Sequence, residues 1–326
     1  MIQNQINNSE QLIVPEIEVV SATKKPFIEA NTKAVKLVHL KKDCTIPVFS
    51  KDNECTIAHQ EFIDIAQECA SNIFSGHSIS LPEVRVSHVV KGRIPSAIGK
   101  PVKELLEHEK TIYYERMMFA IEIPTISENV YGQSLKLTIG GVRAYNQENL
   151  YSKKSIEKFK FFIGFKNMVC CNLCVSSDGY VEELKVSSVL DLKNKIMELI
   201  GNYSMQTHLN AMRELPNHSL TEKQFAQFLG RCRLYNYLSK EEKAAIPLLS
   251  LTDGQLNMVA RDYYQDESFC KDQKGNINMW KLFNLLTGAN KSSYIDSFLG
   301  RNVNAFEIVQ SLGNSIKNKE RHWFLN

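Results

Sequence analysis

Two stretches of alternating apolar residues limit what this chain can fold into. Leu135, Leu137 and Ile139 alternate with polar residues, and Phe159 to Phe165 places Phe, Phe, Ile and Phe on one side. A period of two is typical of strands with one buried face. We therefore predict two antiparallel strands. The loop between them is long, which is uncommon in compact domains unless the loop is functional or disordered.

The glycine pair Gly140-Gly141 directly follows the first of these stretches. Glycine inside a strand weakens it and often marks a bulge or a bend. We expect the strand to break or bulge at this pair.

The composition excludes several classes of protein. With 326 residues, 43% hydrophobic and 23% charged, the chain falls in the globular range and can form one large domain or two ordinary ones. A net charge of +3 is too small to argue for nucleic acid or an anionic membrane from the whole chain. There is no apolar run of membrane-spanning length and no secretory signal, so we expect a cytoplasmic protein that does not enter membranes, with eight free thiols.

The remaining pattern predicts the fold class. Apolar residues from Phe62 to Ile73 follow helical spacing within residues 57–74, and Lys36–Pro47 predicts a short strand. From Ser188 onward the chain reads as helical, with capping boxes at Thr221–Gln224 and Thr252–Gln255.

A last helix is predicted to begin at Asn304, as its cap. The fold class is therefore α+β, a mainly antiparallel sheet body with an N-terminal helix, followed by a helical C-terminal part. Residues 1–25 are expected to form a disordered arm, 26–200 the α+β body and 201–326 the helical C-terminal subdomain.

Positive charge gathers in the centre of the chain. Gln133–Val175 holds seven basic and two acidic residues, a net charge of +5 that exceeds that of the whole protein. Cations, stacking rings and side-chain amides together are what proteins use to bind single-stranded nucleic acid. The alternative is an ordinary solvated sheet face with a long loop.

On this basis we predict single-stranded DNA or RNA as the partner. Basic residues would hold phosphates, tyrosines would stack on bases and amides would bond base edges. The candidate residues are Arg143, Tyr145, Asn146, Asn149, Tyr151, Lys153, Lys154 and Lys158.

Other motifs do not complete a known site. Cys170–Cys174 contains C-x-x-C, but a structural zinc site needs four ligands and the sequence offers no second pair, so buried thiols are expected. In Thr287–Ser293 no glycine directly precedes Lys291, as a phosphate loop requires, and Gly288 follows a helix, so we expect a turn between helices. No nucleophile elbow or dinucleotide fingerprint occurs, and no metal or cofactor is expected.

Two alternatives to nucleic-acid binding stay open. One is an enzyme for a small polar or nucleotide substrate, with Asn146, Glu148 and Asn172 in a cleft between sheet and helices. The other is a protein-interaction or host-defence-countering module that uses the C-terminal helices. The sequence gives neither an oligomeric state nor a complete catalytic signature, so it leaves open whether the chain is an enzyme.

Two long strings resemble a known family. Leu137–Lys154 and Trp280–Leu299 are similar to the domain of unknown function family 3871 of Bacteroides-type bacteria, and the likeness covers nearly the whole chain after Pro26. Val169–Leu173 and Trp280–Asn284 are more loosely similar to strings of a phage/plasmid-like family, from which this chain departs at Cys174 and Phe283. The resemblance implies a mobile-element context and no known activity.

Overall fold

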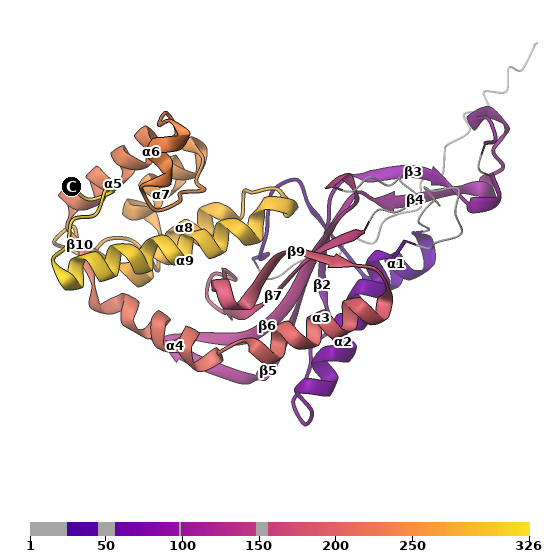
Figure 1. Ribbon diagram of the computed structural model, residues 1–326, viewed down its shortest axis with the longest axis horizontal. Helices are drawn as coiled ribbons and strands as arrows, with labels where there is room; N and C mark the ends of the chain where they lie inside the picture. The colour runs from indigo at the N-terminus through magenta and orange to yellow at the C-terminus, as the bar shows by residue number, and fades with distance from the viewer. Residues whose placement is uncertain (1–24, 45–55, 98, 148–155) are drawn as a thin grey trace, which may run out of the picture.

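A curled antiparallel sheet forms the body of the protein (Figure 1). The computed structural model describes residues 25–44, 56–97, 99–147 and 156–326. Within these residues the sheet has seven strands: β1 (Lys33–Val35), β2 (Glu83–Val86), β5 (Arg116–Val130), β6 (Gln133–Ala144), β7 (Glu157–Asn167), β8 (Leu173–Cys174) and β9 (Tyr180–Val186). They lie in the order β1-β2-β5-β6-β7-β8, and β9 pairs with β7 beside β8.

Four further strands form two small antiparallel pairs. They are β3 (Val89–Arg93) with β4 (Lys110–Tyr114), and β10 (Ser219–Leu220) with β11 (Ile277–Asn278). Figure 1 shows the β3–β4 ribbon projecting from the sheet, on the side away from the C-terminal helices.

The predicted strand pair lies at the centre of the sheet. Strands β6 and β7 pair antiparallel, with Leu137 opposite Phe165 and Ile139 opposite Ile163. The same parity puts Phe159, Phe161 and Phe165 on one face, and they are all buried. The pairing predicted from alternation is confirmed.

The glycine pair does not interrupt β6, contrary to the expectation. The strand runs through Gly140 and Gly141, and both residues stay paired with β5 and β7. A Cβ on Gly140 would lie 2.1 Å from the Phe119 carbonyl oxygen, and one on Gly141 would lie 2.4 Å from the Phe62 ring. These glycines are needed for close approach, and the register irregularity of the hairpin lies elsewhere, in β5.

Nine helices occur in the described ranges. They are α1 (Leu37–Asp43), α2 (His59–Ile73), α3 (Val189–Asn202), α4 (Met205–Glu214), α5 (Glu222–Tyr235), α6 (Lys240–Ala244), α7 (Asp253–Gln265), α8 (Met279–Asn290) and α9 (Ile295–Asn318). Both predicted capping boxes form: the Thr221 and Thr252 hydroxyls each accept from the backbone N–H three residues on, at 3.3 Å.

Helices cover both faces of the sheet. On one face, the Phe62 ring of α2 meets Phe119 at 5.1 Å and Phe159 at 4.7 Å, both edge to face. On the other face, Phe298 and Leu299 of α9 join a second apolar cluster with sheet residues such as Phe162. The sheet is therefore a central layer.

Two local predictions are wrong. Residues 37–43 form helix α1, where a strand was expected over 36–47. Asn304 lies inside α9, which begins nine residues earlier at Ile295. The Asn304 side chain does not cap a helix; it donates to the Leu248 carbonyl and accepts from the Ser250 N–H, each at 2.8 Å. It thus fastens the segment before α7 to α9.

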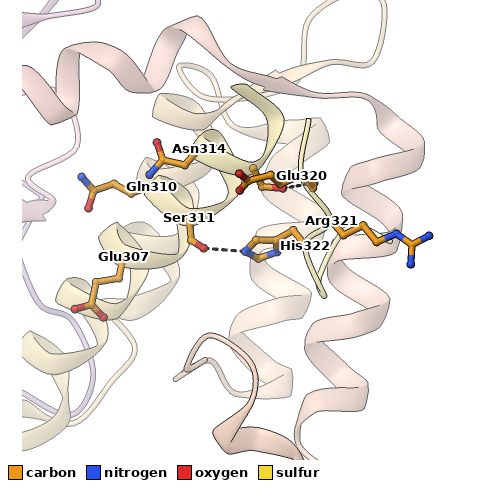
Figure 2. Close-up of a pocket in the computed structure, with 8 residues that line it drawn as sticks. Glu307, Gln310, Ser311, Asn314, Glu320, Arg321 and His322 are labelled. Atoms are coloured by element: carbon orange, nitrogen blue, oxygen red, sulfur yellow. Dashed lines mark hydrogen bonds between the residues drawn. The ribbon is translucent and has the colours of Figure 1, made fainter. Parts of the chain in front are cut away.

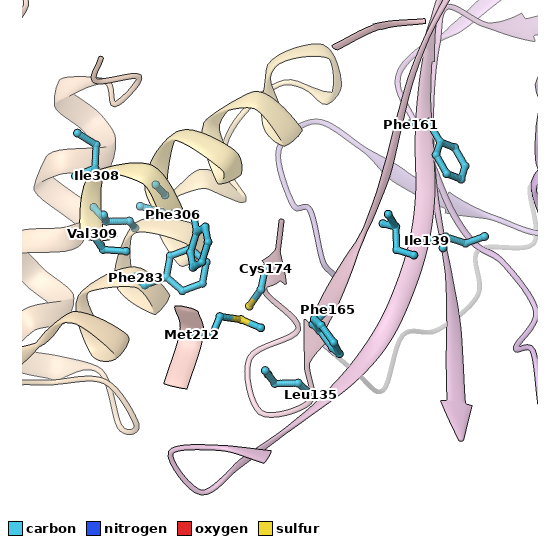
Figure 3. Close-up of a cluster of buried hydrophobic side chains, with 14 of the residues drawn as sticks. Leu135, Ile139, Phe161, Phe165, Cys174, Met212, Phe283, Phe306, Ile308 and Val309 are labelled. Carbon is cyan, nitrogen blue, oxygen red and sulfur yellow. The ribbon is translucent and has the colours of Figure 1, made fainter. Parts of the chain in front are cut away.

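The C-terminal helices share apolar packing with the sheet (Figure 3). The buried His208 of α4 meets the Phe165 ring of β7 at 5.8 Å and the Phe306 ring of α9 at 5.0 Å. Phe306 in turn meets Phe283 of α8 at 5.4 Å. One cluster of buried residues therefore runs from the sheet into the helices. The division of the chain at about residue 200 stays a prediction.

A buried amide network fixes α8 against the end of β7. Asn167 donates to the Asn284 side-chain oxygen at 3.2 Å and to Gln133 at 2.7 Å, and Asn172 donates to the Asn284 carbonyl at 2.9 Å. Trp280 Nε1 donates to the same Gln133 oxygen at 3.1 Å. Buried amides cost free energy unless they are paired, so this network admits few alternative placements of α8.

The N-terminal end of the described chain packs against the body of the protein. The predicted arm, residues 1–25, lies outside the described residues except for Lys25. Phe27 and Ile28 are buried, and the Glu29 N–H donates to the Lys291 carbonyl at 2.9 Å. Over the described part of the chain, no helix is both long and apolar enough to cross a bilayer.

Replacing Gly140 with alanine tests the close-approach explanation. The new Cβ would collide with backbone, which cannot move aside cheaply, so Gly140→Ala should lower the free energy of unfolding by about 3 kcal/mol. Urea denaturation measures this. The matched control is Gly201→Ala in α3, where nothing lies within 4 Å and alanine should stabilise the helix by up to about 1 kcal/mol. Equal effects of the two changes would contradict the explanation.

Replacing Asn284 with alanine tests the amide network. The change removes the side-chain oxygen that accepts from Asn167 and the amide that donates to the Trp280 carbonyl, so we expect a loss of about 2 kcal/mol in unfolding free energy. Asn314→Ala, at an exposed site of α9, should change stability by less than about 0.5 kcal/mol in the same denaturation assay. A loss for Asn284→Ala no larger than that of the control would show that the network contributes little.

Candidate functional site

The predicted nucleic-acid site is only partly within the described residues. Asn149, Tyr151, Lys153 and Lys154 lie outside them. The other four candidates lie before and after these residues in the chain. Arg143 is the last residue but one of β6, Tyr145 and Asn146 belong to the 3₁₀ turn η4 (Tyr145–Gln147), and Lys158 is near the start of β7.

Arg143 does not face solvent. Its side chain is 0% exposed, its guanidinium pairs with Glu157, and it donates to the Lys158 carbonyl at 3.2 Å. It also lies over the Phe159 ring at 4.0 Å. The expectation that Arg143 holds a phosphate on the surface is therefore wrong, because the guanidinium is enclosed by its own fold.

Tyr145 is buried as well, at 1% exposure. Its ring stacks on His59, with centroids 4.5 Å apart, so neither ring is presented for a base. His59 Nε2 donates to the Tyr114 carbonyl at 2.8 Å, and burial lowers the pKa of His59 to about 3, which keeps the imidazole neutral near pH 7. The predicted base-stacking role of Tyr145 is wrong for the same reason as that of Arg143.

Strand parity explains both corrections. Arg143 lies directly opposite Phe159 in the β6–β7 ladder, and residues opposite each other point to the same face. That face is the one covered by α2. A first strand that ended at Gly140-Gly141 would place Arg143 and Tyr145 in a solvated loop, but β6 continues past the pair.

The other two described candidates do reach the surface. Asn146 is exposed, and its side-chain oxygen accepts from Arg116 Nε at 3.3 Å. Lys158 is 42% exposed and forms an ion pair with Glu183 of β9. Both lie at the point where the chain enters or leaves residues 148–155.

An exposed aromatic ring that is not among the residues predicted from the sequence contacts Arg116, as Asn146 does. Tyr294, the residue before α9, is 64% exposed, and the Arg116 guanidinium lies 5.8 Å from its ring centroid. Gln147 donates to the Asp296 carboxylate at 3.2 Å. We call Arg116, Asn146, Gln147, Tyr294 and Asp296 the Tyr294 surface.

Helical spacing is the signal that could have found Tyr294. The apolar face of α9 begins with Ile295, Phe298 and Leu299, and all three are buried against the sheet. Tyr294 precedes this face and does not belong to it. An aromatic residue outside the apolar periodicity of its helix is a candidate for exposure.

A groove of about 470 Å³ adjoins the Tyr294 surface through Gln147. Its charged lining is balanced: Lys158 pairs with Glu183, and Lys160 lies 3.5 Å from Glu182. Lys160 also donates to the Asp296 carbonyl at 2.7 Å. The described part of this groove is therefore not a basic channel.

A second groove, of about 490 Å³, lies along α9 near the C-terminus (Figure 2). In it Ser311 Oγ and His322 Nε2 are 2.9 Å apart, a pair that invites comparison with a nucleophile and its base. His322 Nδ1, however, accepts from the Phe324 N–H at 3.3 Å, so Nε2 carries the proton and donates to Ser311. Burial lowers the pKa of His322 and favours this neutral form. In this tautomer the imidazole cannot deprotonate the serine.

The residues of the enzyme alternative do not converge. Asn146 follows the Arg143–Phe159 end of the β6–β7 ladder, and Asn172 follows the Leu135–Asn167 end. Eight strand residues separate these ends, which corresponds to about 26 Å. Asn172 is buried in the amide network, and Glu148 lies outside the described residues.

The cysteines behave as thiols where the structure describes them. Cys171 and Cys174 are buried and free, and burial raises the pKa of Cys174. Within the described ranges, no three His, Cys, Asp or Glu side chains come together as metal ligands would.

Comparison with known protein families matches residues 8–325 to the family described as "Domain of unknown function, B. Theta Gene description (DUF3871)". The match spans nearly the whole chain, so the chain belongs to this family, as Leu137–Lys154 and Trp280–Leu299 predicted. Searches of curated proteins and of solved structures each found no match. The looser likeness to a phage/plasmid-like family stays a prediction.

Replacing Glu157 tests the structural role of Arg143. Glu157→Gln removes the carboxylate that compensates a fully buried guanidinium, so we expect unfolding free energy to fall by about 3 kcal/mol. Glu198→Gln, at an exposed position of α3, is the control and should change it by less than about 0.5 kcal/mol. If Glu157→Gln is as mild as the control in chemical denaturation, Arg143 is not a buried charge that needs compensation.

Proposed function

We propose that this protein binds single-stranded DNA or RNA at the Tyr294 surface, together with basic residues of the segment 148–155, which follows Gln147 in the sequence. The observation that carries the proposal is the exposed Tyr294 ring beside the Arg116 guanidinium and the Asn146 amide. A ring, a cation and an amide within one surface are the groups that hold an unpaired base and its phosphate.

Tyr294 provides the stacking face. It is held at the start of a helix whose next residues are buried, so its backbone is fixed while the ring stays open. Stacking on a fixed aromatic ring contributes about 1–3 kcal/mol per base and tolerates any base. The proposed binding is therefore independent of sequence.

Phosphate contacts are few in this proposal. The nearby cations Lys158 and Lys160 are engaged by Glu183 and Glu182, which leaves Arg116 at 3.8 Å from Glu115 as the cation beside the ring. In the sequence, Lys153 and Lys154 of the segment 148–155 add two more. Binding through two or three phosphates gives a salt dependence with a slope of about −2 on a logarithmic plot for single strands.

The biological setting is part of the same proposal. The looser likeness to a phage/plasmid-like family favours an accessory protein of mobile elements that acts on single strands in the cytoplasm. The protein-interaction alternative, through the C-terminal helices, stays a prediction.

The proposal is tested by fluorescence anisotropy with a labelled oligothymidylate and its RNA counterpart over a range of salt. Tyr294→Ala should weaken binding about tenfold, because it removes the stacking ring. Lys153→Gln with Lys154→Gln should weaken binding and lower the salt slope by about 1.

The control is Tyr237→Ala, which removes another exposed tyrosine, in the turn between α5 and α6. It should leave affinity unchanged. Absence of salt-sensitive binding by the unmodified protein to either strand would end the proposal. An equal loss for Tyr237→Ala and Tyr294→Ala would show that the Tyr294 surface is not the site.

A further inference from the structure

A second cluster of chemically active side chains lies at the end of α1, apart from the Tyr294 surface. His39 Nδ1 is 2.7 Å from Asp43 Oδ2, and His39 Nε2 is 3.0 Å from the Tyr114 hydroxyl. The sulfur of Cys44 lies 3.9 Å from the same Nε2 atom. A thiol, an imidazole and a carboxylate are thus aligned in that order.

The carboxylate fixes the proton of the imidazole. Asp43 can only accept when ionised, so Nδ1 carries the hydrogen and Nε2 presents its lone pair. This lone pair faces both the Cys44 thiol and the Tyr114 hydroxyl. It is the tautomer that a base needs, in contrast to His322, whose Nε2 is a donor.

Cys44 is reachable but needs a base. Its sulfur is a free thiol and the residue is only partly buried. Burial, with the negative charge of Asp43, raises the pKa of Cys44 to about 12, so the thiol alone would hardly ionise near pH 7. Proton transfer to His39 is the available route to a thiolate.

Holding α1 in place does not require these groups. Leu40 is buried under the helix, and Lys41 of α1 pairs with Asp64 of α2 at 2.8 Å. His39 is partly exposed and Asp43 is exposed, which is unusual for side chains whose purpose is anchoring. The alignment therefore calls for a chemical explanation.

We propose that Cys44 is a nucleophilic thiol, with His39 as its base and Asp43 as the residue that positions the imidazole. The site takes a small electrophile with a reactive carbon. The sulfur forms a bond to that carbon, the bond from the carbon to its leaving group breaks with its electron pair, and the thiol proton passes to His39 Nε2. Tyr114 competes with Cys44 for the same lone pair.

Iodoacetamide is a direct probe of this reaction, with iodide as leaving group. Trypsin releases Cys44 in the peptide Asp43–Lys51, which contains no other cysteine, so mass spectrometry follows its alkylation separately. Cys270, also free and partly buried, is followed in the peptide Asp262–Lys271 as the internal reference. It has no histidine contact within the described residues.

Three variants give distinct expectations at pH 7. His39→Gln should slow alkylation of Cys44 about a hundredfold, the lower range for a positioned general base. Asp43→Asn should slow it less, because the imidazole remains but loses its orientation. Tyr114→Phe should accelerate it, since removal of the hydroxyl frees the lone pair for the thiol. Cys270 should react at one rate throughout.

The Tyr114 variant separates this proposal from a structural role. If His39 served only to anchor the Tyr114 hydroxyl, Tyr114→Phe would leave the rate at Cys44 unchanged or change Cys270 as well. Equal rates at Cys44 in the unmodified protein and His39→Gln, with unchanged thermal unfolding, would overturn the proposal. So would a Cys44 that resists alkylation until the protein unfolds.

Discussion

The placement of the C-terminal helices depends on the buried amide network around Asn284. Apolar contacts tolerate small shifts of one helix against another. A buried amide that loses its hydrogen-bond partner costs free energy, so it allows few alternative positions. Asn167 and Asn172 flank the cysteine-rich turn, and Asn284 lies in α8 more than a hundred residues later. The start of α9, and with it Tyr294, follows α8 directly, so the exposed ring owes its position to these hydrogen bonds.

The net charge of the central segment does not predict where its cations lie in the folded protein. The net +5 of the central segment suggested a cationic surface, yet Arg143 is enclosed and Lys158 and Lys160 face Glu183 and Glu182. The acidic partners of Lys158 and Lys160 come from β9, outside the segment in which the charges were counted. A neighbouring strand thus pairs with two of these cations, and the binding surface that we propose relies on an aromatic ring.

The two proposed sites lie on either side of one strand connection. Tyr114 ends β4 and faces the Cys44 cluster, while Arg116 begins β5 and lies over Tyr294. Glu115 lies between them in the chain, and its carboxylate is 3.8 Å from the Arg116 guanidinium. Among the described residues it accepts no hydrogen bond from the Cys44 thiol or the His39 imidazole. The same three-residue segment therefore contributes to both proposed sites, the nucleophilic thiol and the stacking ring, and the two proposals can be tested independently.

The sequence by itself determined the features that arise from local periodicity and capping. It gave the β6–β7 pairing, the helical spacing of residues 57–74, the Thr221 and Thr252 caps and the family, because each is encoded within a few neighbouring residues or one continuous string. Only the tertiary structure decided that Arg143 is buried, that Asn304 ties two segments together, that Tyr294 is exposed and that His39, beside Cys44, meets Tyr114. Those outcomes depend on contacts between residues far apart in the chain, and on how far β6 continues, because a longer strand places its added residues alternately on the two faces of the sheet.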